Sequence, residues 1–339
     1  MKKVGIKKLL AIATSLLLVS ILLGGCSSSG TPASGGEKKI EYPTKPIEIT
    51  VGFAAGGTAD ISTRMAAEGA KKYLPNGQSF VVSNKTGASG TIQLAEIFQS
   101  KPDGYKLGSV TTGNLIMQPN FGKTPYKATD FEPIAMLSTM PNLLVVRSDA
   151  PYNTFEEWLE YVKANPDKFT YGTAGTGDTK HVAMAALSFE YDIKVKQVAF
   201  DGSAQTLTAL LGGHIMGAIA GPNEIKSYVD SGQVKVLANL GSTKTDEFGD
   251  IAFIKELKPS YPGFDTWTAI VAPKGTPKEI IDILAEAFEK ALQDPEVIAN
   301  FQKTGTQPAY AGPEELRKII ETSAKVSKEV MLKAGIIKE

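Results

Sequence analysis

The sequence predicts an α/β protein with two domains that face each other across a cleft. From Tyr42 onwards, apolar and β-branched runs alternate with helical runs, which is typical of sheets covered by helices. Several of the apolar runs end in a loop rich in Gly, Ser and Thr that leads directly into a helix. A body of about 300 residues is long enough for two domains. We therefore expect each half of the alternation to form one of them.

The alternation predicts the individual elements in order. In the first half, strands are expected near residues 47–53, 79–84, 105–111 and 142–147, and helices near 59–73, 91–100 and 154–164. In the second half, strands are expected near 169–172, 194–199, 215–220 and 234–240, and helices near 180–190, 203–211 and 223–230. A strand at 267–272 and helices near 277–293, 295–303 and 313–333 follow. Strands that alternate with helices predict parallel sheets.

The loop at residues 52–58 shows why these strand-to-helix junctions are candidate binding sites. Gly56 and Gly57 permit positive φ and a close approach of another molecule, and Thr58 can cap the helix that follows. The first N–H groups of a helix favour an anion. Similar loops occur at residues 86–91 and 173–179. Three such loops could converge on one ligand, in the place where open α/β sheets bind their ligands.

The first 41 residues predict export and lipid attachment. Residues 1–8 carry four lysines and residues 9–23 are mostly apolar, so residues 1–25 have the pattern of a secretory signal peptide. A true membrane span is disfavoured, because this apolar core is shorter than the roughly 20 residues that a bilayer requires. The sequence Leu-Gly-Gly-Cys that ends at Cys26 resembles the lipobox of bacterial lipoproteins. We expect Cys26 to carry lipid and residues 26–41 to form a flexible tether.

Composition argues against several other kinds of protein. Cys26 is the only cysteine, which rules out an intrachain disulfide and a multi-cysteine metal site, and two histidines are too few for a histidine-rich one. Four of the 36 basic residues lie in residues 1–25, so the rest of the chain has 32 basic and 36 acidic residues. No Lys/Arg cluster is interleaved with aromatic residues, so a nucleic-acid partner is not expected. We expect neither a metal nor a cofactor.

An ordered set of short motifs resembles one family over nearly the whole chain beyond the signal peptide. These motifs are residues 42–47, 52–64, 84–90, 102–105, 171–177, 202–204, 210–213, 229–232 and 272–277. The set is similar to the substrate-binding proteins of tripartite tricarboxylate transporters, often called Bug receptors. The resemblance implies a two-lobed periplasmic-binding-protein fold of the Venus-flytrap type (type II-like). We expect residues 42–141 with 268–339 to form one lobe and residues 142–267 the other.

The resemblance also implies a function. The protein would be a receptor, not an enzyme, that acts as a monomer outside the cytoplasm, at the cell surface or in the periplasm, held on the membrane by lipid on Cys26. It would hold a small organic carboxylate between its lobes and deliver it to the membrane permease subunits of a tripartite tricarboxylate transporter. The carboxylate could be a dicarboxylate, a tricarboxylate, an acidic amino acid or an aromatic acid.

Matching positions carry the family's ligand contacts onto four loops and the end of one strand. The expected ligand-binding residues are Phe53, Ala54, Ala55, Gly56, Gly57, Thr58 and Asp60; Thr86, Gly87, Ala88, Ser89, Gly90 and Thr91; Thr112 and Asn114; Gly175, Thr176, Gly177, Asp178 and Thr179; and Gly202 and Ser203. His181 and Asp201, beside these loops, are added from their own positions. Asp60 could instead only stabilise its helix start, and a lone His181 could be a structural hydrogen-bonder.

The sequence departs from the family pattern at three places. Residues 52–57 read Gly-Phe-Ala-Ala-Gly-Gly where the family usually has Pro-Phe-Pro-Pro-Gly-Gly. Residues 200–202 read Phe-Asp-Gly where many members have Tyr-Lys-Gly, and Met216 stands where aspartate is frequent. The family's ligand contacts in the first lobe can therefore be transferred to this chain more safely than any ligand specificity in the second lobe. Asp178 and Asp201 suggest a ligand that carries an amino group as well as a carboxylate.

Two other functions stay open from the sequence. An extracytoplasmic enzyme on the same fold has little support, because the chain has no Gly-x-Ser-x-Gly elbow, no His-Glu-x-x-His motif and no cysteine besides Cys26. A receptor that senses a ligand and signals to a membrane partner would use the same binding site as a transport receptor. The chain does not separate these two roles.

Overall fold

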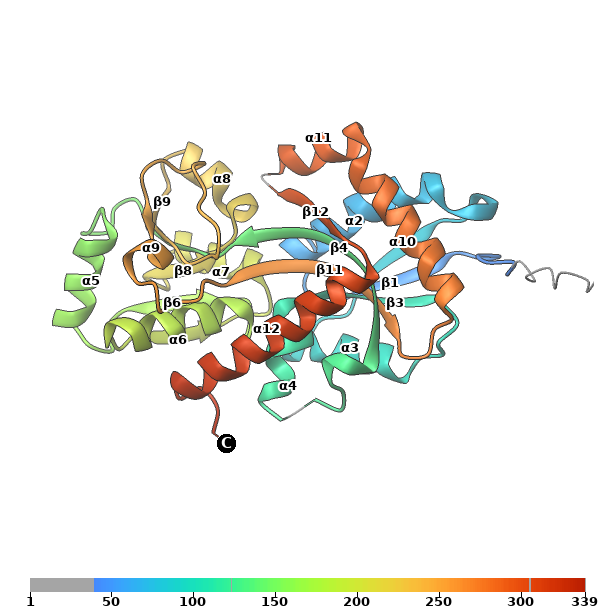
Figure 1. Ribbon diagram of the computed structural model, residues 1–339. Helices are drawn as coiled ribbons and strands as arrows, with labels where there is room; N and C mark the ends of the chain where they lie inside the picture. The colour runs from blue at the N-terminus through green and yellow to red at the C-terminus, as the bar shows by residue number, and fades with distance from the viewer. Residues whose placement is uncertain (1–39, 123, 305, 339) are drawn as a thin grey trace, which may run out of the picture. The chain divides into compact units, whose positions relative to one another are not determined.

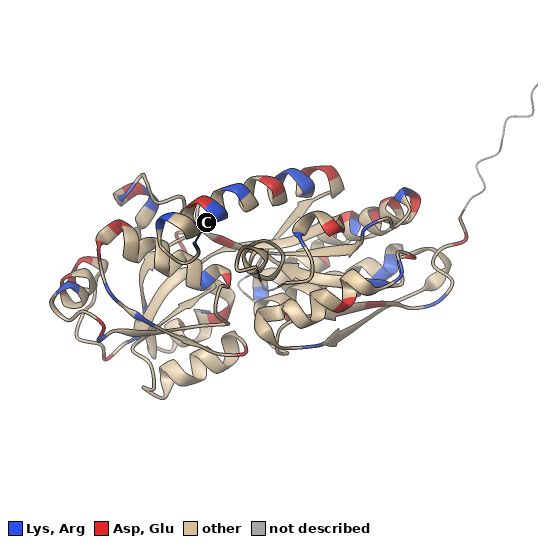
Figure 2. Cartoon of the chain, turned by 90° about the horizontal axis from the view of Figure 1, so that it is seen from below, with Lys and Arg blue, Asp and Glu red and all other residues tan. Residues whose placement is uncertain are grey.

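Two six-stranded sheets, each covered by helices, carry the structure (Figure 1). The computed structural model describes residues 40–122, 124–304 and 306–338, which belong to one compact unit. The predicted signal peptide, Cys26 and the tether as far as residue 39 lie outside the described residues. Among the described residues, no helix is long and apolar enough to cross a bilayer. Acidic and basic residues alternate along the exposed helices (Figure 2).

The first sheet and its helices are called lobe 1 and the second sheet and its helices lobe 2. The order in lobe 1 is β12 (Gln307–Ala311), β4 (Phe131–Pro141), β11 (Asp265–Pro273), β3 (Lys106–Thr111), β1 (Ile47–Val51) and β2 (Phe80–Asn84). The order in lobe 2 is β10 (Ala252–Phe253), β9 (Val234–Asn239), β5 (Leu143–Arg147), β8 (Gly217–Ala220), β6 (Thr170–Thr173) and β7 (Lys196–Ala199).

The expectation of parallel sheets is only partly correct. β1 pairs in parallel with β2 and β3, and β6 with β7 and β8. β11 is antiparallel to β3 and β4, β12 to β4, and β5 to β8 and β9. β5 and β11 are the strands by which the chain enters one lobe from the other, at Asn142 and after Phe264, and neither entry uses the crossover helix that parallel pairing requires.

Every helix that the sequence predicts is present. Those of lobe 1 are α2 (Thr58–Ala70), α3 (Thr91–Gln99), α10 (Lys278–Gln293), α11 (Pro295–Lys303) and α12 (Pro313–Lys333). Those of lobe 2 are α5 (Phe155–Ala164), α6 (Thr179–Tyr191), α7 (Ser203–Leu211) and α8 (Pro222–Asp230). The sequence did not predict β4, β10, β12, the short helices α4 (Gln118–Asn120) and α9 (Ile254–Leu257), or the π-helical turn Gly113–Met117.

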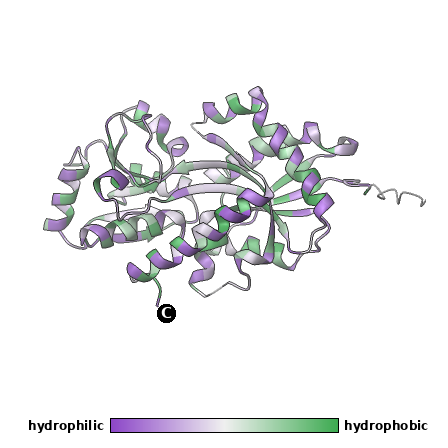
Figure 3. Ribbon diagram, in the orientation of Figure 1, coloured by the Kyte–Doolittle hydropathy of each residue, from purple (hydrophilic) through white to green (hydrophobic). Residues whose placement is uncertain are grey.

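Apolar helix faces build the core of lobe 1 on both sides of its sheet. α10 places Ile281, Leu284 and Phe288 at helical spacing, and these side chains pack with α2 on one face. α3 and the first half of α12 cover the other face, with Leu316 among the buried residues. Each fully buried side chain of this size stabilises the fold by roughly 1.5–3 kcal/mol. Hydrophilic residues occupy the outer faces of these helices (Figure 3).

The two lobes are joined at two neighbouring points of the chain. The chain passes from β4 to β5 at Asn142 and returns at Phe264, just before β11. The Asn142 side chain donates to the carbonyl of Phe264 at 2.7 Å and accepts from Thr266 Oγ1 at 3.0 Å. α12 adds a further link, because Met331 near its end is buried in the core of lobe 2.

Candidate ligand-binding site between the lobes

A cavity of about 50 Å³ lies where the two lobes meet. Lobe 1 lines it with Phe53, Ala54, Gly57, Thr58, Ala59 and Thr111, the joining strands with Met140 and Thr266, and lobe 2 with Ala174, Asp178, Thr179, Lys180, Gly202, Ser203, Ala204 and Glu224. Pockets that hold small molecules commonly enclose roughly 300–1,000 Å³. The lobes must therefore separate to admit a ligand.

Three helices begin at this cavity, and they differ in how they are capped. α2 and α7 follow Gly57 and Gly202, and neither N-cap makes a side-chain hydrogen bond. α6 follows Asp178, whose carboxylate accepts the N–H of His181 at 2.7 Å. The first N–H groups of a helix have no partner inside the helix and carry a partial positive charge. The starts of α2 and α7 are therefore suited to an anionic group.

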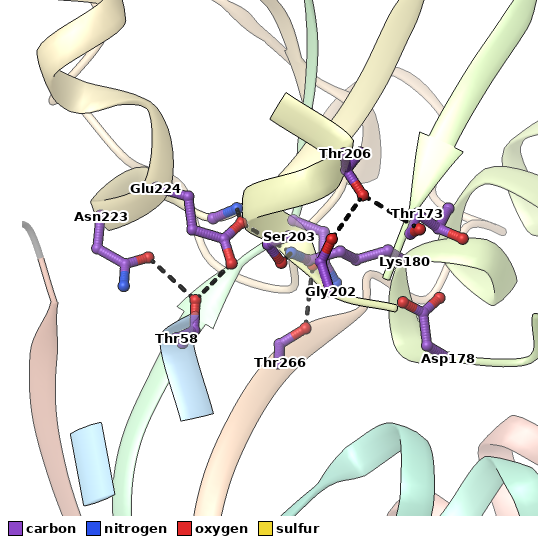
Figure 4. A network of polar contacts seen from close by, with 12 residues as sticks. Thr58, Thr173, Asp178, Lys180, Gly202, Ser203, Thr206, Asn223, Glu224 and Thr266 are labelled. Carbon is purple, nitrogen blue, oxygen red and sulfur yellow. Dashed lines mark hydrogen bonds and ion pairs between the residues drawn. The ribbon is translucent and has the colours of Figure 1, made fainter. Parts of the chain in front are cut away.

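A buried ion pair forms one wall of the cavity. Lys180 Nζ lies 2.7 Å from Glu224 Oε2 and 2.7 Å from Ser203 Oγ (Figure 4). Glu224 also accepts the N–H of Gly221 at 2.8 Å and the hydroxyl of Thr58 at 2.6 Å, so this contact joins the lobes. Burial alone would raise the pKa of Glu224, but the Lys180 ammonium and these hydrogen bonds lower it below its usual value. Glu224 and Lys180 thus form a neutral pair.

Asp178 is the other acidic residue of the cavity. It is only 5% exposed and forms no ion pair with another described residue. Burial raises its pKa from 3.8 to about 6, although the His181 N–H and the Lys180 charge act in the opposite direction. Figure 4 shows it beside the Lys180–Glu224 pair, with no interaction drawn to either side chain. Among the described residues, no cation is therefore paired directly with Asp178.

The structure brings part of the predicted first loop to the cavity. Phe53, Ala54, Gly57 and Thr58 line it, whereas Ala55 and Gly56 are exposed and lie outside the lining. Asp60 does not line it either. Its carboxylate accepts the N–H of Gly56 at 3.0 Å, the Nε of Arg64 at 2.9 Å and the Nδ2 of Asn84 at 2.8 Å. The Asp60 carboxylate is thus engaged by its own loop, its own helix and Asn84.

The second predicted loop lies beside the cavity and contributes nothing to its lining. None of Thr86, Gly87, Ala88, Ser89, Gly90 and Thr91 is among the lining residues. Ser89 instead donates its hydroxyl to the carbonyl of Thr176 in lobe 2, at 3.1 Å. Gly175, Thr176 and Gly177 do not line the cavity either. The second and third loops therefore meet each other across the lobe boundary.

Lobe 2 supplies Asp178, Thr179, Gly202 and Ser203 from the prediction, but not Asp201 or His181. Asp201 is exposed, because it precedes the glycine that turns the chain into α7. His181 Nδ1 accepts the N–H of Gly177 at 2.9 Å, and burial lowers its pKa to about 4. His181 is thus neutral and holds the third loop in shape.

Thr112 and Asn114 lie behind the cavity. Thr112 donates to the carbonyl of Asp265 at 3.3 Å, and Asn114 Oδ1 accepts the N–H of Thr111 at 2.8 Å. Thr111, one residue before the predicted position, lines the cavity. Asn114 therefore supports the cavity wall through Thr111, from a π-helical turn (Gly113–Met117) that the sequence did not predict, while Thr112 precedes that turn and contacts the start of β11.

Sequence reasoning missed two of the three charged residues that line the cavity, Lys180 and Glu224. A cation inside a Gly-rich helix start was a usable signal for Lys180. Glu224 stands three residues after Gly221 and resembles an ordinary acid in the first turn of a helix, so no local sequence pattern identified it as a cavity residue. Among the described residues, no group of three or more His, Cys, Asp or Glu side chains could hold a metal ion.

Comparison with known proteins agrees with this architecture. Residues 62–336 match the profile of the TctC family, described as the tripartite tricarboxylate transporter family receptor. The chain belongs to this family. The solved structure of the periplasmic binding protein BugD is 30% identical to this chain, with a TM-score of 0.78, and the match covers 88% of this chain and 100% of BugD. The predicted resemblance to Bug-type receptors and the predicted two-lobed fold are thereby confirmed.

Two further relatives extend the comparison for this TctC receptor. A UPF0065 protein of Cupriavidus necator is 31% identical over 88% of this chain and 90% of its own length. The R. palustris protein Rpa4515, solved with adipate, is 25% identical with a TM-score of 0.79, over 87% of this chain and 99% of that one. TctC proteins are solute-binding receptors.

Proposed function

We propose that this TctC receptor captures a small organic carboxylate between its lobes and delivers it to a tripartite tricarboxylate-type permease. The observation that carries the proposal is the meeting of two uncapped helix starts, α2 from lobe 1 and α7 from lobe 2, at one cavity. Each helix start favours an anion by roughly 0.3–1 kcal/mol when exposed and up to about 2 kcal/mol when partly buried. The adipate bound by Rpa4515 is a dicarboxylate, which supports this ligand class.

Capture would follow from closure of the lobes. A carboxylate that contacts both helix starts binds the closed form better than the open form, and only such a difference in affinity can shift the equilibrium. The Thr58–Glu224 and Ser89–Thr176 hydrogen bonds each join lobe 1 to lobe 2 and would break when the lobes open. They would favour closure.

We infer that the receptor works outside the cytoplasm, anchored by lipid on Cys26. The location of its relative BugD in the periplasm and the lipobox-like sequence that ends at Cys26 support this. Intact mass measurement of the protein purified from membranes tests it. A diacylated N-terminal Cys26, absent from a Cys26→Ser variant, is expected; an unmodified N-terminus would contradict the anchor.

Thermal unfolding with a panel of carboxylates tests binding. A ligand at 100 times its Kd stabilises the native state by about 2.7 kcal/mol and must raise Tm. Ala204 is exposed and lines the cavity at the start of α7, so Ala204→Trp should fill the space and abolish the shift. Thr208→Trp, one turn further along α7 and exposed, is the matched control and should keep it. No Tm shift with any carboxylate would contradict the proposal.

A further inference from the structure

We propose that the carboxylate captured by this receptor also carries an ammonium group, and that Asp178 binds that group. The inference rests on the proposed function, because it names the class of ligand within the same cavity. It depends on three features of the described residues: how the charges of the cavity balance, how deeply Asp178 is buried, and which helix starts lack a cap.

The charges that line the cavity do not balance without a ligand. Lys180 is the cation of the lining, and its ammonium is already 2.7 Å from Glu224 and 2.7 Å from Ser203. Glu224 and Lys180 neutralise each other, which leaves one carboxylate, Asp178, with no counter-charge within hydrogen-bond distance. A plain dicarboxylate would add two more negative charges beside it. A ligand ammonium would supply the missing cation.

The capping role of Asp178 does not by itself account for a buried acid. Ser and Asn cap helices as well as Asp does, and neither carries a charge into the protein. At 5% exposure, an ionised carboxylate without a cation is costly, which is why buried charges in proteins are normally paired. The charged and titratable groups around Asp178 are Lys180 and His181 on its own helix, Tyr171 on β6 and Glu224 on α8. Only Lys180 is a cation, and it is engaged elsewhere.

The three helix starts then divide the cavity into two kinds of site. α2 and α7 present free N–H groups, so each can receive a carboxylate. At α6 the Asp178 carboxylate already occupies the positive end of the helix, so this corner repels a second anion and attracts a cation. Two anion sites and one cation site match a small dicarboxylate that bears an amino group.

One alternative uses the same residue in the opposite way. A protonated Asp178 could donate to a plain dicarboxylate. The two possibilities differ in the direction of their pH dependence. A ligand ammonium needs the ionised form, so its affinity rises or stays level from about pH 5 to pH 7.5. A plain dicarboxylate needs the protonated form, so its affinity falls over the same range.

Calorimetric titration of the purified protein with matched pairs, succinate against aspartate and glutarate against glutamate, tests the proposal. At about pH 7.5 we expect the aminated member of a pair to bind about 10-fold or more tightly, as a charge-assisted hydrogen bond allows. Asp178→Asn keeps a capping side chain and removes only the charge, so it should reduce that preference to less than about 3-fold. Asp192→Asn, at the exposed far end of α6, is the control and should leave it unchanged.

The outcomes separate the two proposals. Equal or tighter binding of the plain dicarboxylates by the unmodified protein would overturn the inference and leave the carboxylate-receptor function standing. A preference that survives in Asp178→Asn would overturn the assignment of Asp178. An affinity for the aminated ligand that falls with rising pH would also contradict it. Failure of every plain and aminated carboxylate to bind would overturn the proposed function itself, and the inference with it.

Discussion

At the scale of single residues, the cavity combines a neutral ion pair with an acid that the fold leaves uncompensated. The Lys180–Glu224 pair is buried and hydrogen-bonded on both sides, so removal of either partner would leave a buried charge. Asp178 is in that unfavourable position already. The cost of this buried charge is removed when Asp178 takes up a proton or when a cationic group binds to it, and both events can be measured.

Asp178→Asn should change how stability depends on pH. The folded-state pKa of Asp178 is raised from 3.8 to about 6, so the folded protein binds this proton more tightly than the unfolded chain does. The stabilisation that this proton gives to the folded state is fully present below about pH 4 and is lost as pH rises through about 6. The Asp178→Asn variant has no titrating group at this position, so it does not show this loss. Without ligand, the unmodified protein should lose about 2–3 kcal/mol of unfolding free energy relative to the variant between about pH 4 and pH 7.5.

Urea unfolding of both proteins at the two pH values measures this difference. The Asp192→Asn variant, whose residue is exposed, should follow the unmodified protein at both. If the difference between the unmodified protein and Asp178→Asn does not vary with pH, Asp178 is not perturbed by burial.

At the scale of elements, the Gly-rich loops divide their tasks. The first loop and the start of α7 line the cavity, whereas the second loop reaches across and contacts the third through Ser89 and Thr176. Gly175 is what permits that contact. Its φ is +146°, and a Cβ there would lie 2.2 Å from Ser89 Oγ. Only glycine suits both the backbone conformation and the close approach.

Gly175→Ala should therefore impede closure and weaken carboxylate binding by at least about 10-fold, since the closed form would lose the Ser89–Thr176 hydrogen bond and gain a clash. Gly232→Ala is the control, because it also has positive φ, +69°, but has nothing within 4 Å of the added Cβ. Removing the obstructing side chain in the double variant Ser89→Gly/Gly175→Ala should restore part of the affinity. Titration calorimetry measures all three, and an unchanged Kd for Gly175→Ala would show that the two loops need not touch.

At the scale of the whole molecule, α12 ties the lobes together. Leu316 and Ile320 are buried in the core of lobe 1, and Met331, about four turns later on the same helix, is buried in the core of lobe 2. The two chain crossings at Asn142 and Phe264 are close to each other and allow a hinge. The helix therefore limits how far the lobes can separate and couples their unfolding.

Met331→Ala should weaken that coupling. Truncation of a fully buried Met typically costs about 2–5 kcal/mol, and here the loss falls on the contact between α12 and lobe 2. Scanning calorimetry should show lobe 2 unfolding at a lower temperature than lobe 1, in place of a single transition. Val326→Ala on the exposed side of α12 is the matched control, with an expected change below about 0.5 kcal/mol. One unchanged transition for Met331→Ala would contradict the role of α12.

Much of this fold was predictable because its information is local. Periodic apolar positions such as Ile281, Leu284 and Phe288 predicted α10, and the Gly-rich loops predicted where α2, α6 and α7 begin. β4 and β12 were not predictable in this way, since Pro133 and Pro308 interrupt them and proline is unfavourable in strands. Their strand conformation is imposed by pairing with neighbours that are distant in the chain.

The candidate site was predictable only as a set of loops. The order of motifs in the chain identified the family and the residues at which α2, α6 and α7 begin, because a few adjacent residues determine a loop and the cap of the helix that follows it. Which loops line the cavity and which merely touch each other depended on folding. Thr58 meets Glu224 from 166 residues away and Lys180 meets it from 44, distances over which no local spacing specifies a contact. The isolation of Asp178 follows from such pairings, because the packing of α6, α7 and α8 within lobe 2 engages Lys180 with Ser203 and Glu224.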